Sequence, residues 1–145
     1  MKSLFLVLGL ALSLVATNSY AVDIKTINTI LQKFGREFKQ AKDIRWTNTD
    51  ELLVIEFKEE EKTRYAYYNQ EAELLVLAKP MTVGQLNESL QQELAKKYNA
   101  FVVTDVYQLN DKEGIKYSAV AIKGNEKIIL SSNGKKWQLM KNRFN

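Results

Sequence analysis

Carboxylate, lysine, tyrosine and serine side chains are the groups of this chain that could carry out catalysis. The sequence contains no histidine and no cysteine. Their absence excludes Ser-His-Asp and Cys-His catalysis, thiol chemistry and the usual zinc sites. The glycines are scattered and form no phosphate-binding loop, and no stretch matches an EF-hand. The residue types therefore predict no metal site and no cofactor.

One acidic cluster could still act on a substrate. It consists of Glu56, Glu59, Glu60 and Glu61. Two carboxylates held about 5 to 9 Å apart in a cleft can hydrolyse a glycosidic bond. A run of charges at the tip of a hairpin is, however, typical of a solvated turn. We therefore expect no enzyme, and a carboxylate-dependent hydrolase of the cell envelope stays the alternative.

Aromatic side chains on expected strands are the better functional candidates. Tyrosine and tryptophan offer large, rigid contact area with a polar group, which is why they are common in binding hot spots. Because strand side chains alternate, Tyr65 and Tyr67 share one face, and Ala66 and Tyr68 point the other way. The alternative is that these aromatics are core residues or cross-strand pairs. The candidate binding residues are Trp46, Tyr65, Tyr67, Tyr107, Tyr117 and Trp137.

The first half of the chain reads as one helix followed by four strands. An apolar stripe at helical spacing predicts a helix over about 23–40; its members are Ile27, Ile30, Leu31, Phe34 and Phe38. Short β-type runs separated by polar turns then predict strands at 44–47, 52–57, 63–68 and 74–78.

The second half repeats this plan after Pro80, the only proline. Thr82, with Gln85 three residues later, predicts the start of a helix through a capping box, and Met81 with Leu86 could form the hydrophobic staple. The helical stripe comprises Val83, Leu86, Leu90, Leu94 and Tyr98. Strands are expected at 101–109, 115–122, 127–131 and 136–140, and Asn133-Gly134 is typical of a tight hairpin.

The two halves also align by residue at an offset of about 60 positions, which indicates a duplication. Phe34 and Phe38 correspond to Leu94 and Tyr98, Trp46 to Tyr107, and 66–68 to 128–130. We expect an α+β fold in which two helix-plus-four-strand meanders form one continuous antiparallel sheet, with both helices on one face. The repeats are 22–80 and 81–145, together one compact domain over 22–145. So wide a sheet should curl, leaving a concave open face.

These motifs resemble the PepSY-like family of small exported proteins. The resemblance is carried by the Ile44-Arg45-Trp46 strand, by Ala66-Tyr67-Tyr68 with its polar turn, and by the repetition of the pattern. The chain departs from the family pattern at the turn 69–72, which lacks glycine, and at Leu86-Asn87, where the family often has Leu-Pro. The resemblance implies a fold similar to the β-lactamase inhibitor protein, a periplasmic or secreted location, and a binding or inhibitory role.

The first 21 residues indicate export. Lys2 precedes an apolar run, and Ser19-Tyr20-Ala21 places small residues where a signal peptidase requires them. Removal of this segment takes away one lysine and leaves 124 residues with 20 basic and 17 acidic side chains, a net charge of +3. So small a surplus predicts neither nucleic-acid nor membrane binding. The basic tail (Lys135, Lys136, Lys141 and Arg143) is explained more simply by a solvated edge strand than by a polyanion site.

The sequence thus predicts a periplasmic or secreted, non-enzymatic module. It would bind a protein or peptide through an open, aromatic-bearing sheet face, in an inhibitor-like manner. A small-ligand carrier or a structural envelope protein remains an alternative, and a deep apolar pocket would favour the carrier.

Overall fold

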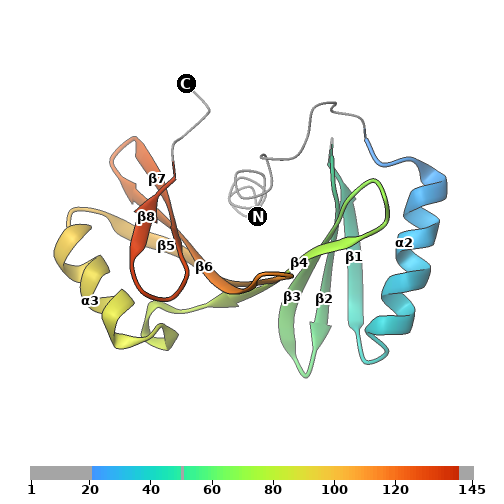
Figure 1. The fold of residues 1–145 in the computed structure, drawn as a ribbon, viewed down its shortest axis with the longest axis horizontal. Coiled ribbons are helices and arrows are strands. Elements are labelled where there is room, and N and C mark those ends of the chain that lie inside the picture. The colour runs from blue at the N-terminus through green and yellow to red at the C-terminus, as the bar shows by residue number, and fades with distance from the viewer. Residues whose placement is uncertain (1–20, 50, 141–145) are drawn as a thin grey trace. The chain divides into compact units, whose positions relative to one another are not determined.

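The computed structural model describes residues 21–49 and 51–140 (Figure 1). The expected signal peptide therefore lies outside the described residues except for Ala21. The first half contains helix α2 (Ile24–Glu37) and strands β1 (Lys42–Asn48), β2 (Leu53–Glu59), β3 (Lys62–Tyr68) and β4 (Leu74–Met81). The second half contains the 3₁₀ turn η1 (Val83–Gln85), helix α3 (Glu88–Lys97) and strands β5 (Val102–Asp111), β6 (Gly114–Lys123), β7 (Glu126–Ser132) and β8 (Trp137–Leu139).

The eight strands form one sheet in which the spatial order is the order of the sequence, β1 to β8. The pairs with a described register are all antiparallel. The expected α+β fold is confirmed: the described residues form two α-helices and an eight-stranded antiparallel open sheet.

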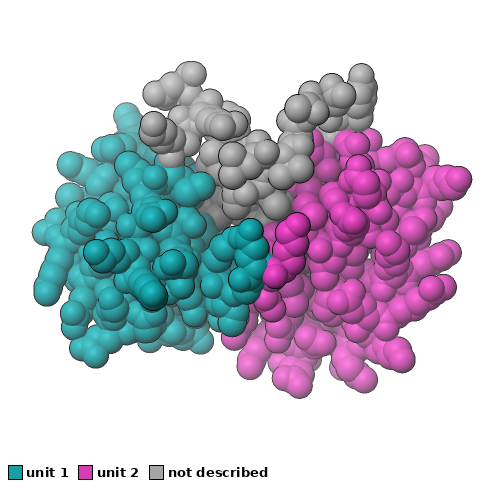
Figure 2. Space-filling model, in the orientation of Figure 1, with its two compact units in different colours: residues 1–15, 80–109, 113–145 teal, residues 16–79, 110–112 magenta. Residues whose placement is uncertain are grey.

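The chain divides into two compact units, coloured separately in Figure 2. The α2 unit comprises Ala16–Lys79 and Asn110–Lys112, and the α3 unit includes Pro80–Leu109 and the chain from Glu113 onward. Each helix packs on one face of the strands of its own unit.

The core of the α2 unit joins the stripe of α2 to alternate residues of β2 and β3. Phe34 packs edge-to-face on Phe57, with the ring centroids 4.9 Å apart. Ile27, Ile30 and Phe34 are the buried residues of α2. Their partners on the strands include Leu53, Ile55, Phe57, Ala66 and Tyr68, whose spacing by two residues places them on one face.

Asn48 ties the start of this unit to strand β1. Its side-chain Oδ1 accepts a hydrogen bond from the Val22 backbone N–H (3.2 Å), and its Nδ2 donates to the Val22 carbonyl (2.9 Å). Val22 is buried. Asp23 then caps the helix by accepting from Thr26 N–H at 2.8 Å, and this hydrogen bond lowers the pKa of the Asp23 carboxyl. Both polar groups of the Val22 backbone are therefore satisfied where the helix begins.

The helix of the first half ends earlier than expected. We expected it to reach about residue 40, but α2 ends at Glu37 and Phe38 is its C-cap. The Phe38 N–H donates to the Phe34 carbonyl, and Ala41 N–H donates to the Phe38 carbonyl, so the chain turns directly into β1.

The predicted capping box of Thr82 and Gln85 forms, but the α-helix that it was expected to start begins later in the chain. Gln85 Oε1 does accept from Thr82 N–H at 2.9 Å, as a capping box requires, but this pair closes the three-residue turn η1. Helix α3 begins at Glu88 and is capped by Asn87, whose Oδ1 accepts from Leu90 N–H at 3.0 Å. The expected apolar stripe is nevertheless correct, since all its members pack in the core of the α3 unit.

The last hairpin is present but has a longer loop than Asn133-Gly134 alone. β7 ends at Ser132 and β8 begins at Trp137, so four residues connect them. Gly134 has a φ of +98°, whereas Asn133 is not left-handed. The two-residue type I′ turn that the dipeptide suggested therefore does not form.

The structure supports part of the residue alignment between the halves. Tyr98 caps α3 with the same hydrogen bonds that Phe38 makes at the end of α2. The alternation of residues 66–68 also matches that of 128–130, because Ala66, Tyr68, Ile128 and Leu130 all lie on the helix side. Trp46 and Tyr107 do not match, since Val106 occupies the helix side of β5.

Candidate functional site

Strand pairing in the α2 unit decides which candidate aromatics share a face. Tyr65 lies opposite Glu56 and Tyr67 opposite Val54, whereas the neighbouring Ala66 lies opposite the core residue Ile55. Tyr65 and Tyr67 therefore share the face that points away from α2, as the alternation predicted.

Only one of these two tyrosines offers surface. Tyr67 is 1% exposed, whereas Tyr65 is partly exposed beside Glu56 and Ala78. Burial, and secondarily the charge of Glu56, raise the pKa of the Tyr65 phenol. Tyr65 is thus a neutral hydrogen-bond donor at physiological pH.

Trp46 lies on the other side of the same sheet. It pairs with Ile55, so its side chain is on the α2 side, yet 48% of it is exposed. The exposure follows from the position of β1, which is the first strand of the sheet and contacts only β2 among the described strands. Every residue of β1 is exposed, and Ile44 adds a second exposed apolar side chain. We call Lys42–Asn48 the β1 edge.

The candidates in the α3 unit are mostly covered. Trp137 is 2% exposed and lies in the core under α3, where its Nε1 donates to the Leu90 carbonyl at 3.1 Å. Tyr117 packs against the same core and is partly exposed. Tyr107 is 7% exposed, and its hydroxyl donates to Asp105 Oδ1 at 3.5 Å. These three side chains offer a partner little area.

The structure therefore does not bring the six candidates into one patch. Trp46 and Tyr65 are the candidates with exposed area in the α2 unit, and they lie on opposite faces of its strands. Sequence patterns did not identify the exposure of the whole β1 edge, since an edge strand and a central strand have similar local composition. The charged residues Lys42, Asp43 and Arg45 were the available signal.

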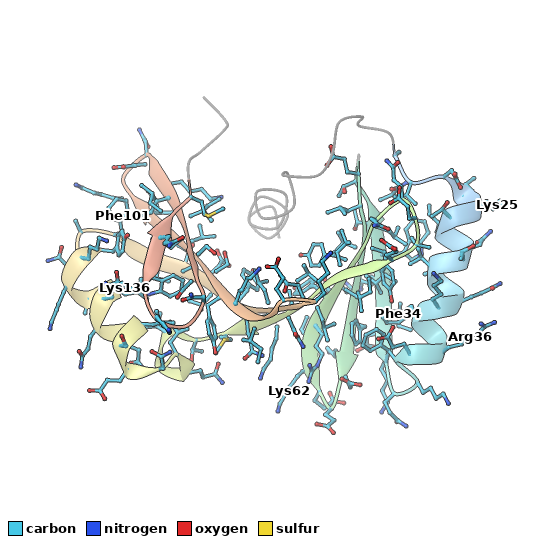
Figure 3. The ribbon with its side chains drawn as sticks, in the orientation of Figure 1. Lys25, Phe34, Arg36, Lys62, Phe101 and Lys136 are labelled. Atoms are coloured by element: carbon cyan, nitrogen blue, oxygen red, sulfur yellow. The ribbon has the colours of Figure 1, made fainter. Side chains whose placement is uncertain are left out.

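Three residues of the acidic cluster, Glu59, Glu60 and Glu61, lie at a hairpin tip, whereas Glu56 lies within β2 opposite Tyr65. Glu60 and Glu61 form the two-residue turn between β2 and β3, with φ of 51° and 61°, and both are exposed. The next residue, Lys62, is labelled in Figure 3 at the end of this hairpin. Glu59 forms an ion pair with Arg64 at 3.3 Å. Glu60 and Glu61 thus form the solvated turn that was the simpler interpretation, and they are not held in a closed cleft as acid and base.

Two surface hollows accompany these elements. One, of about 320 Å³, lies beside the acidic tip and is lined by Gln40, Lys42, Lys58 and Glu59–Glu61. The other, of about 440 Å³, lies in the α3 unit and is lined by lysine, serine, asparagine and glutamine side chains. Neither is the deep apolar pocket that a carrier would need.

Among residues 21–49 and 51–140, no three His, Cys, Asp or Glu side chains gather as they would around a metal ion. Within the same ranges, no helix has the length and apolar character needed to cross a membrane.

Comparison with solved structures shows the fold. A BLIP-like protein from Bacteroides fragilis has a TM-score of 0.66 and 18% identity, over 81% of this chain and 86% of that one. A DUF2874 family protein from Bacteroides uniformis has a TM-score of 0.66 and 11% identity, over 85% and 94%. A candidate periplasmic protein from Bacteroides eggerthii has a TM-score of 0.66 and 16% identity, over 81% and 91%. No protein-family model and no curated protein matches the chain.

The chain therefore has a BLIP-like fold. At these identities the likeness extends to the fold alone, and membership of the PepSY-like family stays a prediction. The structural neighbours are described as BLIP-like, DUF2874 and periplasmic proteins, and none of these descriptions names a catalytic activity.

Proposed function

We propose that the mature protein is an exported, non-enzymatic module that binds a protein or peptide through the β1 edge, in an inhibitor-like manner. The observation that carries the proposal is Trp46, a half-exposed tryptophan on a strand whose residues are all exposed. The BLIP-like fold supports a protein partner.

Physical chemistry favours this surface over the other candidates. An exposed tryptophan that a partner covers can contribute several kcal/mol, and tryptophan is enriched among hot-spot residues. An edge strand also presents unpaired backbone N–H and C=O groups to which an extended segment can add. Arg45 follows Ile44 and precedes Trp46, and its cross-strand partner is Glu56. The β1 edge therefore carries both apolar and charged side chains.

Partner capture with matched variants tests the proposal. The mature chain and its Trp46→Ala and Tyr65→Ala variants are immobilised and exposed to periplasmic extract of the host, and retained proteins are identified by mass spectrometry. Val102→Ala, at a side chain 70% exposed in the α3 unit, is the control for loss of an exposed apolar group.

We expect a partner that the wild type and the control retain and that Trp46→Ala loses, whereas Tyr65→Ala should retain it because Tyr65 lies on the opposite face. Circular dichroism verifies that each variant is folded. Equal recovery of every protein by all four chains would contradict the proposal.

A further inference from the structure

The 440 Å³ hollow of the α3 unit lies on the face of its strands that points away from α3. Ser131 pairs with Ser118 on one side and with Gln138 on the other, whereas the neighbouring Leu130 belongs to the core under α3. Since strand side chains alternate, Ser131, Gln138 and Lys116 share the face away from the helix. Ser132 and the loop after it complete the lining, with Asn133, Lys135 and Lys136.

The lining carries positive charge and hydrogen-bond donors but no carboxylate. Three of its side chains are lysines: Lys116, Lys135 and Lys136. Lys116 is paired with Glu113. Lys135 and Lys136 are exposed, and neither has a carboxylate within ion-pair distance among the residues that the structure describes. Figure 3 labels Lys136 in this unit.

The backbone that carries these two lysines is fixed by hydrogen bonds from α3 and its cap. Asn87 Nδ2 donates to the Gly134 carbonyl at 2.9 Å, and Ser89 Oγ donates to the Lys135 carbonyl at 3.4 Å. Glu93 Oε2 accepts from Trp137 N–H at 2.8 Å, immediately after the loop. Two ammonium groups are therefore carried on an ordered support, which lowers the entropy lost when a ligand binds.

We propose that this hollow is a binding site for a small ligand that carries carboxylate or phosphate groups. Ammonium groups act as point charges toward such oxyanions, and the hydroxyl of Ser131 and the amides of Asn133 and Gln138 supply neutral donors. The volume of about 440 Å³ falls within the range of small-molecule sites. This proposal is independent of the β1 edge and holds whether or not a protein partner binds there.

Titration with two probes tests the site and separates its two ligand chemistries. Inorganic phosphate and citrate are titrated separately into the ¹⁵N-labelled mature chain at low ionic strength, with sodium chloride of matched ionic strength as the blank. The readout is the shift of the backbone amide signals of residues 131–138.

We expect saturable binding of at least one probe with Kd below about 1 mM. The variant Lys135→Gln/Lys136→Gln should weaken it about tenfold or more, because each hydrogen bond to a charged group contributes roughly 1.5 to 3 kcal/mol. The control Lys25→Gln/Lys39→Gln removes the same charge from exposed positions of the α2 unit and should leave the affinity within about twofold. The probe that binds identifies the ligand chemistry.

Two results would overturn the proposal. One is shifts that rise linearly with both probes and match the chloride blank. The other is equal weakening by the two lysine variants, which would show that net charge, rather than the hollow, attracts the anion.

Discussion

At the scale of single residues, burial rather than identity separates the aromatic side chains of this protein. Trp46 and Trp137 have the same chemistry and were both candidates, yet one is 48% exposed and the other 2%. The difference depends on strand order and on where α3 packs, which a single-sequence pattern does not contain. The shared face of Tyr65 and Tyr67 could be predicted because it follows from alternation alone.

Tyr68 gives a prediction at this scale. It is 1% exposed in the core under α2, and its hydroxyl has no hydrogen-bond partner. Burial, with a smaller contribution from Glu37, raises the pKa of the Tyr68 phenol to about 12 from its ordinary 10.0. Above pH 10 the unfolded chain loses this proton while the folded chain keeps it, so stability falls between pH 10 and about 12.

Tyr68→Phe should remove roughly 2 kcal/mol of this alkaline loss. At pH 7 it should leave stability unchanged or raise it by up to about 1 kcal/mol, because an unpaired buried hydroxyl is removed. Urea unfolding of both chains at pH 7, 10 and 11.5 measures the difference. Parallel pH dependences for the two chains would contradict the assignment.

At the scale of elements, apolar periodicity located the helices and strands, but it did not locate their ends. The stripe from Val83 to Tyr98 suited one helix begun by Thr82, and the chain instead makes a 3₁₀ turn before α3. Two residues that can cap a helix, Thr82 and Asn87, stand five positions apart, and only packing of the following turn decides between them. The sequence alone therefore does not predict which of these two residues caps α3.

Asn87→Ala should destabilise the protein by about 1 kcal/mol, because the cap of α3 is lost. It also removes the hydrogen bond to the Gly134 carbonyl. Thr82→Ala is the matched control and should cost less, because Thr82 caps only the three-residue turn η1. Chemical denaturation measures the loss of unfolding free energy in each variant. A larger loss for Thr82→Ala would show that Thr82, rather than Asn87, is the more important cap.

The β2–β3 hairpin allows a stabilising change. Glu60 and Glu61 both adopt positive φ, which asparagine and glycine tolerate better. Glu60→Asn/Glu61→Gly should raise the free energy of unfolding by about 1 kcal/mol. The double variant Glu60→Gln/Glu61→Gln removes the charges without changing the turn preference and separates relief of backbone strain from relief of charge repulsion. An equal gain from both variants would attribute the effect to charge.

At the scale of the whole molecule, the sheet is open and its first strand is protected mainly by charge. The β1 edge carries Lys42 and Arg45, and its register shifts between them, which interrupts a regular edge. The sequential strand order was predictable from the short polar connections between β-type runs. The exposure of β1 along its whole length could not be predicted, because this exposure depends on how the chain folds at each end of the sheet.

Replacing both charges, in Lys42→Val/Arg45→Val, should cause self-association by strand addition at the β1 edge. Lys25→Val/Arg36→Val, at exposed residues of α2 labelled in Figure 3, makes the same chemical change away from a strand and should stay unassociated. Light scattering after size-exclusion chromatography gives the mass of each. If the helix variant associates to the same extent, added apolar surface rather than the strand edge causes the association.

The double hydrogen bond between Asn48 and Val22 has a consequence for maturation. The predicted cut after Ala21 breaks the peptide bond between Ala21 and Val22. A signal peptidase must bind the residues on both sides of this peptide bond in an extended form. In the folded protein Val22 is buried, and the Asn48 side chain forms hydrogen bonds with both the N–H and the carbonyl of Val22. The predicted cleavage would therefore have to precede the pairing of Asn48 with Val22, and the new α-amino group of Val22 would then donate the hydrogen bond to Asn48 Oδ1.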